Sequence, residues 1–327
     1  MAVLMICASH TPLMGNVPAG GDNEERVREQ FAILGKEVEA FDPELVVIFS
    51  PDHFRGFFYD LLPLFTVGVR AEALGDYGIG QGPYDVPEEL ALACARACHK
   101  ADVDVAVSYR FKADHGFSQL LMLLGGSVAR WPVIPVHINC AGPPLPSMSR
   151  ARALGAAIGA WAAATGKRVL ILGSGGLSHD PPMPTIADAP PHVVERMIDN
   201  RNSTPEELLA REESNYDVGR RLADGTSDRL PLNPKWDREF MQAMENGRLD
   251  AFDGLSEEDL SAVAGCGSHE VRCWIAAYAA LAACGSYHSE QLFYRDIPLW
   301  NAGMGIAKAI PRAETSRSHV DRMEEGA

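Results

Sequence analysis

Residues 43–53 read Pro-Glu-Leu-Val-Val-Ile-Phe-Ser-Pro-Asp-His, a short apolar run, Leu45–Phe49, that stops at polar residues and a histidine. Consecutive apolar residues without alternation are typical of a strand that is buried on both faces of a parallel sheet. Similar runs rich in β-branched residues predict further strands at Val3–Ala8, Phe65–Val69, Val103–Tyr109, Val133–Ile138 and Val169–Leu172.

Helical periodicity separates these runs. Apolar residues at three- and four-residue spacing predict helices over Glu24–Ala40, Pro87–Lys100 and Ser147–Thr165. Strands that alternate with helices predict an α/β fold, with a mostly parallel central sheet and helices on both of its faces. In such a sheet, ligands bind in the crevice beyond the carboxyl ends of the strands.

The second half of the chain has a different pattern. Prolines between Asp180 and Pro191 interrupt regular structure, and a polar region near residues 192–223 is predicted to form a helical insertion. Ser256–Ala264 and the Ala-rich Ser268–Cys284 are predicted helices. We expect residues 1–310 to form a single domain, followed by a polar tail at 311–327.

Composition excludes several classes of protein. The 327 residues include 29 Lys and Arg against 44 Asp and Glu, a net charge of −15, without a basic cluster to follow phosphates. Nucleic acid and anionic membrane are therefore excluded as partners. The apolar run Ala2–Ala8 is too short to span a membrane, and the seven cysteines are scattered without a C-x-x-C pair, so we expect a cytoplasmic protein with reduced thiols.

Four histidines follow predicted strands closely: His10, His53, His115 and His179. Because the carboxyl ends of parallel strands meet at one edge of a sheet, these imidazoles are predicted to converge on one cleft. A metal centre with acid/base groups is one interpretation. The alternative is four separate turn histidines, each hydrogen-bonded locally.

Two neutral imidazoles and one carboxylate form the facial triad of non-haem Fe(II) oxygenases, which leaves positions open for substrate and oxygen. Glu270 is a candidate because it begins the Ala-rich helix, where Ser268 is placed to cap the first turn. At that position Glu270 also suits a purely electrostatic role at the helix N-terminus. The other candidates for the carboxylate are Asp52, Asp114 and Asp180. Asp52 and Asp114 are equally suited to forming turns.

Together these residues resemble the type III extradiol ring-cleaving dioxygenases over nearly the whole chain. The motifs that carry the resemblance are Ala8-Ser9-His10-Thr11-Pro12-Leu13, Pro51-Asp52-His53, Gly56-Phe57-Phe58-Tyr59-Asp60, Asp114-His115-Gly116-Phe117, Gly173-Ser174-Gly175-Gly176-Leu177-Ser178-His179, Pro231-Leu232-Asn233-Pro234 and Ser268-His269-Glu270.

The resemblance implies a role for each site residue. It implies that His10, His53 and Glu270 bind Fe(II). It also implies that His115 and His179 act as the acid/base pair and that Asp114 assists the histidine beside it. The implied reaction uses O2 to open a catechol with a carboxyalkyl side chain, such as 3-(2,3-dihydroxyphenyl)propionate, to a yellow hydroxy-oxo-dienedioate. A homo-oligomer is also expected, which the apolar Ser268–Cys284 helix favours.

Three alternatives remain open at this level. The same metal site suits a dioxygenase for another catechol or an aminophenol. A non-catalytic scaffold of the same fold and a zinc hydrolase are the others. The group that binds the substrate carboxylate is not identified by the sequence, which offers Arg55, Arg70, Arg110 and others.

Overall fold

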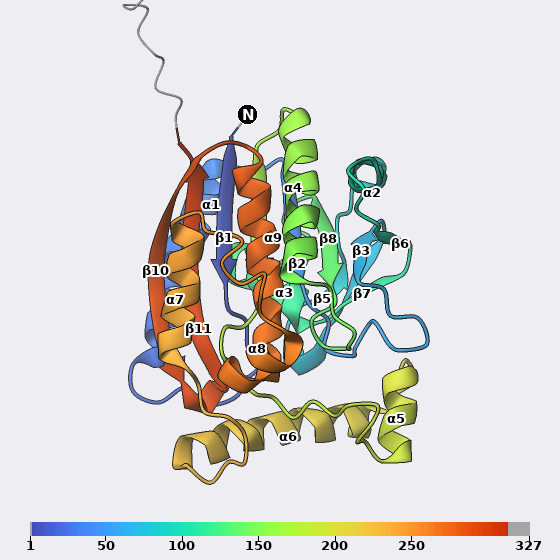
Figure 1. Cartoon of the computed structure of the whole chain (residues 1–327), viewed down its shortest axis with the longest axis vertical. Coiled ribbons are helices and arrows are strands. Elements are labelled where there is room, and N and C mark those ends of the chain that lie inside the picture. Colours follow the sequence, from blue (N-terminus) through green and yellow to red (C-terminus); the bar gives the residue numbers. More distant parts are fainter. Residues whose placement is uncertain (1, 313–327) are drawn as a thin grey trace, which may run out of the picture.

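A computed structural model describes residues 2–312, so the predicted tail lies outside the described residues except for its first two positions. Eight strands form one sheet in the order β10-β11-β1-β9-β2-β8-β3-β6 (Figure 1). Their bounds are β1 Val3–Ala8, β2 Leu45–Ser50, β3 Phe65–Gly68, β6 Ala106–Ser108, β8 Val133–Ile138, β9 Val169–Ser174, β10 Tyr287–Ile297 and β11 Ala302–Pro311.

The centre of the sheet is parallel. Strands β1, β9, β2 and β8 are parallel neighbours, as are β3 and β6, whereas β8 with β3, β1 with β11, and β10 with β11 are antiparallel. The predicted α/β fold with a mostly parallel sheet is therefore confirmed. The antiparallel hairpin of β10 and β11 was not predicted, since its sequence lacks the continuous apolar run of a central strand.

Helices cover both faces of the sheet (Figure 1). Along β1, Val3, Met5 and Cys7 belong to one apolar cluster, while the alternate residues Leu4 and Ile6 belong to another. The first cluster includes residues of α2, α4, α7 and α9, and the second includes residues of α1 and α3. Their bounds are α1 Asn23–Phe41, α2 Glu88–Lys100, α3 His115–Gly125, α4 Met148–Ala164, α7 Pro234–Glu245 and α9 Val271–Ala282.

Some elements differ from those predicted. Val103–Tyr109 contributes only the three-residue strand β6, and a second sheet joins β5 (Gln81–Pro83), β4 (Ala71–Leu74) and β7 (Phe111–Ala113). Helix α3 was missed because most of its residues are buried, so apolar and polar positions do not alternate with helical period.

Helix α6 (Pro205–Asp224) lies across the carboxyl ends of the central strands, and α5 (Pro191–Ile198) lies at one end of α6 (Figure 1). Thr204 and Glu207 form a capping box at the start of α6. Gly219 of α6 lies so close to the carbonyl oxygen of Leu299 that a Cβ atom would overlap it. This approach brings α6 against the segment before β11. Within the described residues, no helix is both long and apolar enough to cross a membrane.

Helix α9 packs against α4 through two glycines. A Cβ atom at Gly155 or Gly159 would overlap the backbone carbonyl of Ala276 or Ala280, so the two helices are nearly in backbone contact. Nearly every side chain of α9 is buried within the subunit. Its apolar surface is therefore covered by the same chain, and the expectation that it favours an oligomer was wrong. The oligomeric state stays a prediction from the resemblance.

We predict that Gly155→Ala lowers the free energy of unfolding by at least about 2 kcal/mol, because a backbone carbonyl cannot move aside as a flexible side chain does. The higher helix propensity of alanine offsets only about 1 kcal/mol. Denaturant unfolding measures the change. The control is Ala156→Ser on the exposed side of α4, for which we expect a change within about 0.5 kcal/mol.

Candidate metal centre and active site

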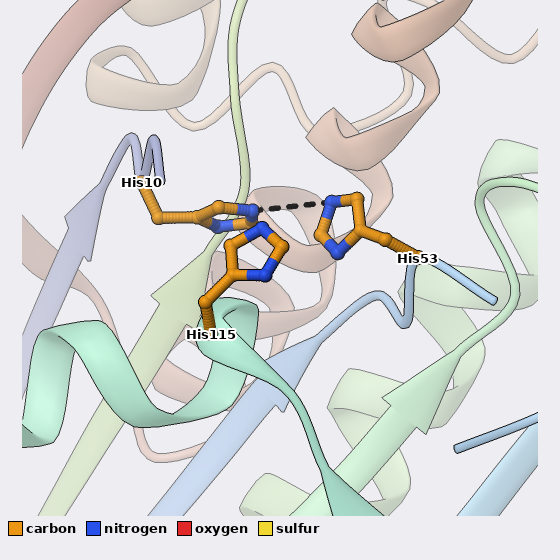
Figure 2. Close-up of side chains that lie close together, drawn as sticks. All are labelled: His10, His53 and His115. Atoms are coloured by element: carbon orange, nitrogen blue, oxygen red, sulfur yellow. Dashed lines mark hydrogen bonds between the residues drawn. The ribbon is translucent and has the colours of Figure 1, made fainter. Parts of the chain in front are cut away.

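The predicted site residues meet at one end of the sheet. His10 follows β1, His53 follows β2, His115 begins α3, and His179 follows β9. Glu270 ends the short 3₁₀ helix Cys266–Glu270 that runs directly into α9. Figure 2 shows the imidazoles of His10, His53 and His115 facing one another. The expectation that the strand-end histidines converge on one cleft therefore agrees with their geometry.

The protonation of His10 follows from its neighbours. Ser174 Oγ lies 3.1 Å from His10 Nδ1 and already donates its only hydrogen to the carbonyl oxygen of Gly116 at 2.6 Å. His10 Nδ1 must then be the donor to Ser174, so the Nε2 atom carries a lone pair. Burial lowers the pKa of His10 to about 3, which keeps the ring neutral. The His10 Nε2 atom is thus a ready metal ligand.

His53 is oriented by the buried carboxylate of Asp114. Its Nδ1 atom and its backbone N–H lie 2.7 and 2.9 Å from Asp114 Oδ2. Burial acts to lower the pKa of His53, but the charges of Asp114 and Glu270 outweigh it and raise that pKa well above its ordinary value. The two carboxylates thus favour positive charge at this point.

Glu270 completes a set of three donors. Its Oε1 lies 3.1 Å from His53 Nε2, its Oε2 lies 3.6 Å from His10 Nε2, and the two imidazole atoms are 3.4 Å apart. Burial opposes ionisation of Glu270, yet the neighbouring His10 and His179 hold its pKa well below the usual range. The backbone N–H of Gly176 donates to Oε2 and aims the carboxylate.

The donor set fits a metal ion. With both Nδ1 hydrogens donated elsewhere, two lone pairs and a carboxylate face one another, and only a proton or a cation between them relieves the repulsion. Ligands about 2.1 Å from one ion and at angles of about 90–110° are roughly 3.0–3.4 Å apart, close to the distances of this set. Two imidazoles and one carboxylate are also the donors that non-haem iron prefers.

His115 has a partner that the sequence did not suggest. Its Nδ1 atom lies 2.7 Å from Asp76 Oδ2, which leaves Nε2 toward the cavity. The His115 ring stacks on His53 with 4.4 Å between centroids, and nitrogen atoms of His10, His53 and His115 lie within 4.8 Å of one another. Asp76 lies in a region without regular periodicity, 39 residues before His115, so no sequence signal connects the two.

His179 lies beside the same oxygen atom of Glu270 as His53 does. Its Nδ1 atom donates to the carbonyl oxygen of Leu177 at 2.9 Å, and its Nε2 atom lies 3.4 Å from Glu270 Oε1. Although burial lowers the pKa of His179, the charge of Glu270 outweighs this and raises it. A Cβ atom at Gly176 or Gly267 would overlap the ring, so these glycines form a slot for it.

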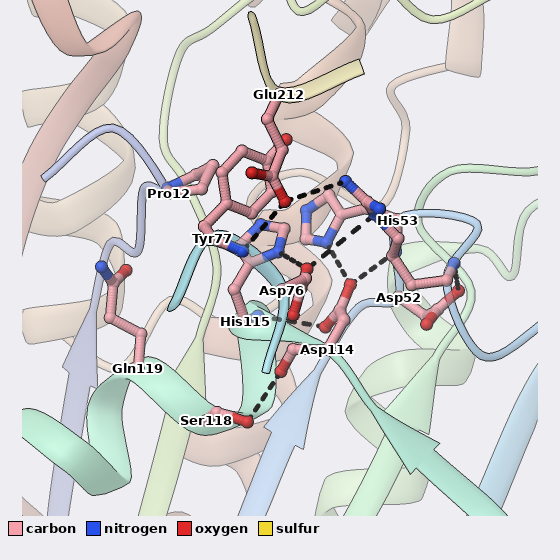
Figure 3. A network of polar contacts seen from close by, with 12 residues as sticks. Pro12, Asp52, His53, Asp76, Tyr77, Asp114, His115, Ser118, Gln119 and Glu212 are labelled. Atoms are coloured by element: carbon pink, nitrogen blue, oxygen red, sulfur yellow. Dashed lines mark hydrogen bonds and ion pairs between the residues drawn. The ribbon is translucent and has the colours of Figure 1, made fainter. Parts of the chain in front are cut away.

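Two sequence interpretations need correction, and the alternative left open for Asp52 is decided. Asp114 hydrogen-bonds His53 rather than the adjacent His115, because as the N-cap of α3 its carboxylate points back toward the end of β2 (Figure 3). Ser268 donates to the carbonyl of Gly265 and does not cap α9, because the 3₁₀ turn continues without a break into that helix. Asp52 is a turn residue whose carboxylate accepts the backbone N–H groups of residues 55–57.

Asp180, the remaining carboxylate candidate, is also structural. Its two oxygen atoms accept the backbone N–H groups of Cys266 and Leu230. Its role is therefore to tie the loop after β9 to the segment before α9.

The four histidines line one cavity that opens to solvent. Arg55 and Arg211 also line it. Arg55 is one of the arginines that the sequence offered for the substrate carboxylate, whereas Arg211 of the polar helix α6 was not named. Arg70 and Arg110 lie at a separate shallow depression, and Arg70 pairs there with Glu88.

We predict that Asp114→Asn destabilises the protein. Asp114 accepts two hydrogens from His53 and one from the backbone of Gly116 within the protein interior, whereas an asparagine offers one oxygen. One unsatisfied buried N–H costs about 1–3 kcal/mol, which chemical denaturation would detect. Asp104→Asn on the surface is the matched control, and an equal effect of both substitutions would contradict the prediction.

Comparison with known proteins agrees with this geometry. The family model described as the catalytic LigB subunit of aromatic ring-opening dioxygenase matches residues 4–305. Proteins from Photorhabdus laumondii and Burkholderia vietnamiensis, each named 2,3-dihydroxyphenylpropionate/2,3-dihydroxicinnamic acid 1,2-dioxygenase, are both 47% identical to this chain. The alignments cover 95% and 97% of this chain and 98% and 100% of theirs.

A solved structure shares the fold. The uncharacterized protein JW3007 from Escherichia coli K12 aligns with a TM-score of 0.50 and 14% identity over 93% of this chain and 98% of its own. At that identity the likeness concerns the fold alone. The family match spans nearly the whole chain, and the chain therefore belongs to the LigB family of aromatic ring-opening dioxygenases, as its resemblance to the type III extradiol enzymes predicted.

Proposed function

We propose that this enzyme is an Fe(II)-dependent extradiol dioxygenase for catechols that carry a carboxyalkyl side chain. The substrate that fits best is 3-(2,3-dihydroxyphenyl)propionate or the corresponding cinnamate, after the names of relatives that are 47% identical. The observation that carries the proposal is the facial set of His10, His53 and Glu270, with two further histidines around one cavity.

In this proposal His10, His53 and Glu270 hold the iron. Bound Fe(II) supplies the Lewis-acid and electron-transfer chemistry by which a catechol and O2 react. The protein contributes ligand orientation: Ser174 and Asp114 fix which nitrogen of each imidazole faces the ion. The Gly176 N–H fixes the carboxylate in the same way.

His179 and His115 are the proposed proton carriers. Because His179 Nδ1 is bound to a backbone carbonyl, its Nε2 atom is the one that accepts the proton of a catechol hydroxyl. His115 is oriented by Asp76 in the same sense, and its Nε2 atom would donate a proton to one oxygen atom of O2 as the O–O bond breaks. The two residues approach the ligand set from different elements, α3 and the loop after β9.

The cavity walls exclude water from the reacting atoms. Leu13, Val218, Trp300 and two prolines of the loop after β9, Pro181 and Pro182, supply apolar surface beside the histidines. An apolar wall strengthens the electrostatic effect of every charged group in the site. It also suits the face of an aromatic ring.

We infer that residues 1–310 form one domain with α5 and α6 as an insertion. The pairing of β1 with β11 supports this, because it places the first and last strands of the described residues in the same sheet. A homo-oligomer and a cytoplasmic location remain predictions.

Oxygen uptake tests the proposed reaction. Anaerobically prepared Fe(II) protein is mixed with 3-(2,3-dihydroxyphenyl)propionate, and oxygen consumption and yellow absorbance are followed together. We expect one O2 per substrate and a yellow product. Zn(II)-loaded protein is the control and should consume none. Uptake with aminophenols alone, or no uptake with any ring substrate despite bound iron, would refute the proposed substrate class or the enzyme activity.

We predict that His10→Ala, His53→Ala and Glu270→Ala each lose iron and activity together, since each removes one of three ligands. Iron bound after desalting is measured by a colorimetric chelator beside turnover. His269→Ala is a useful control because His269 adjoins Glu270 but bonds Ser261 and Arg272 instead. A Glu270→Ala protein with full iron content would remove Glu270 from the ligand set.

We predict that His115→Gln and His179→Gln keep bound iron but lose turnover by about 10²–10⁴-fold, the usual contribution of a positioned acid or base. Iron content and kcat are measured on the same preparation. Loss of iron in His115→Gln would instead make His115 a ligand, a role its distance from His10 and His53 permits. Full turnover in either variant would contradict the acid/base assignment.

A further inference from the structure

Two arginines share the wall of the active-site cavity, and within the described residues no carboxylate oxygen lies closer than 3.9 Å to either guanidinium group. Arg55 follows the turn after β2, and Arg211 comes from α6 of the insertion. Like charges placed together in a mostly buried site repel one another unless an anion lies between them. An anionic group of the ligand, placed beside both guanidinium groups, would offset this repulsion.

Arg55 is only partly paired. Its side chain is 5% exposed, and its Nη1 atom is buried without a hydrogen-bond partner among residues 2–312. The nearest acidic oxygens, on Asp76 and Glu212, lie 3.9 and 4.0 Å away. Both are engaged elsewhere: the Asp76 atom by His115 at 2.7 Å and the Glu212 atom by the backbone of Tyr77 at 3.1 Å (Figure 3).

Arg211 is paired still less. Its one hydrogen bond within the described chain is a long contact of 3.4 Å from Nη2 to the carbonyl oxygen of His53, and it forms no ion pair with a described carboxylate. Burial is the main cause that lowers the pKa of Arg211 to about 10, and the positive charge of Arg55 is the second. At neutral pH the guanidinium stays charged, so it offers unused donors to the cavity.

Both arginines lie close to residues of the proposed active site. The Arg55 guanidinium stacks over the ring of Tyr77 at 5.4 Å, and that ring contacts His115 at 5.0 Å between centroids. Arg211 touches the backbone of His53. An anionic group on a short side chain would reach the arginines while the aromatic ring lies beside the histidines.

We propose that Arg55 and Arg211 form a carboxylate-binding subsite that selects catechols with an acidic side chain. This inference rests on the proposed function for the identity of the ring. The planar forks of two guanidinium groups match the two oxygens of a carboxylate, and both arginines line the cavity. Because one arginine belongs to the β2 loop and the other to α6, the bound carboxylate links the insertion to the sheet.

The first test compares two substrates that differ only in charge. The kcat/KM ratio of 3-(2,3-dihydroxyphenyl)propionate to 3-propylcatechol is measured for the Fe(II) enzyme and for Arg211→Gln. Loss of a charge-assisted hydrogen bond predicts a ratio lower by about 10- to 100-fold, mainly through KM. Arg211→Lys keeps the charge without the fork and should fall between the two. An unchanged ratio in Arg211→Gln would overturn the subsite.

The matched control is Arg220→Gln, which removes the same charge from an exposed position of the same helix. Its ratio should equal that of the unaltered enzyme. An equal fall in Arg220→Gln would show that the net charge of α6, and not a subsite, selects the substrate.

The second test needs neither iron nor turnover. Calorimetry measures binding of 3-phenylpropionate, which has no hydroxyl groups on its ring, to the metal-free protein, with 3-phenylpropanol as the neutral comparison. We expect binding of the acid alone, weakened at least 10-fold in Arg211→Gln and in Arg55→Gln, whose folding is checked by thermal unfolding.

The outcomes separate the two proposals. Arginine-dependent binding of the acid without ring cleavage of any catechol would keep the subsite and refute the proposed reaction. Ring cleavage with no arginine dependence of acid binding and no change in the kinetic ratio would keep the reaction and refute the subsite.

Discussion

A buried carboxylate that faces two imidazole lone pairs is the contact on which this molecule depends. Glu270 is 5% exposed, and its oxygens lie 3.1–3.6 Å from His53 and His10. Such an arrangement is repulsive unless positive charge lies between the groups, so the fold is built around a place for a cation. Asp114 and Ser174 orient the two imidazoles from behind, and the close backbone packing of α4 against α9 holds the helix that follows Glu270.

The cavity has two sides of different origin. His10, His53 and His179 follow strands of the large sheet, His115 begins α3, and Glu270 ends the 3₁₀ helix before the buried α9. The opposite wall comes from α6, which crosses the strand ends and brings Arg211 beside Arg55 (Figure 1). In the proposed function, the reaction chemistry therefore resides on the sheet and its helices, and the insertion contributes the surface that meets the side chain of the substrate.

Sequence alone located much of this architecture. Buried parallel strands have unbroken apolar runs, so β1, β2, β8 and β9 and the helices between them were identified closely, and the histidines at their ends followed from the geometry of parallel sheets. The roles of individual residues came from family resemblance. Strand pairing at the sheet edges, the small second sheet and helix α3 were beyond the reach of periodicity, because short strands and fully buried helices have no alternating pattern.

The sequence by itself determined where donor residues stand relative to strands, because strand ends are marked locally by the change from apolar to polar residues. Only the tertiary structure decided their partners. Asp76 bonds His115, and Asp114 bonds His53 rather than its neighbour, across segments far apart in the chain. Arg211 and Arg55, also far apart in the chain, line the same cavity. Such contacts depend on how helices pack over the sheet, and that packing is a property of the whole core rather than of any local run of residues.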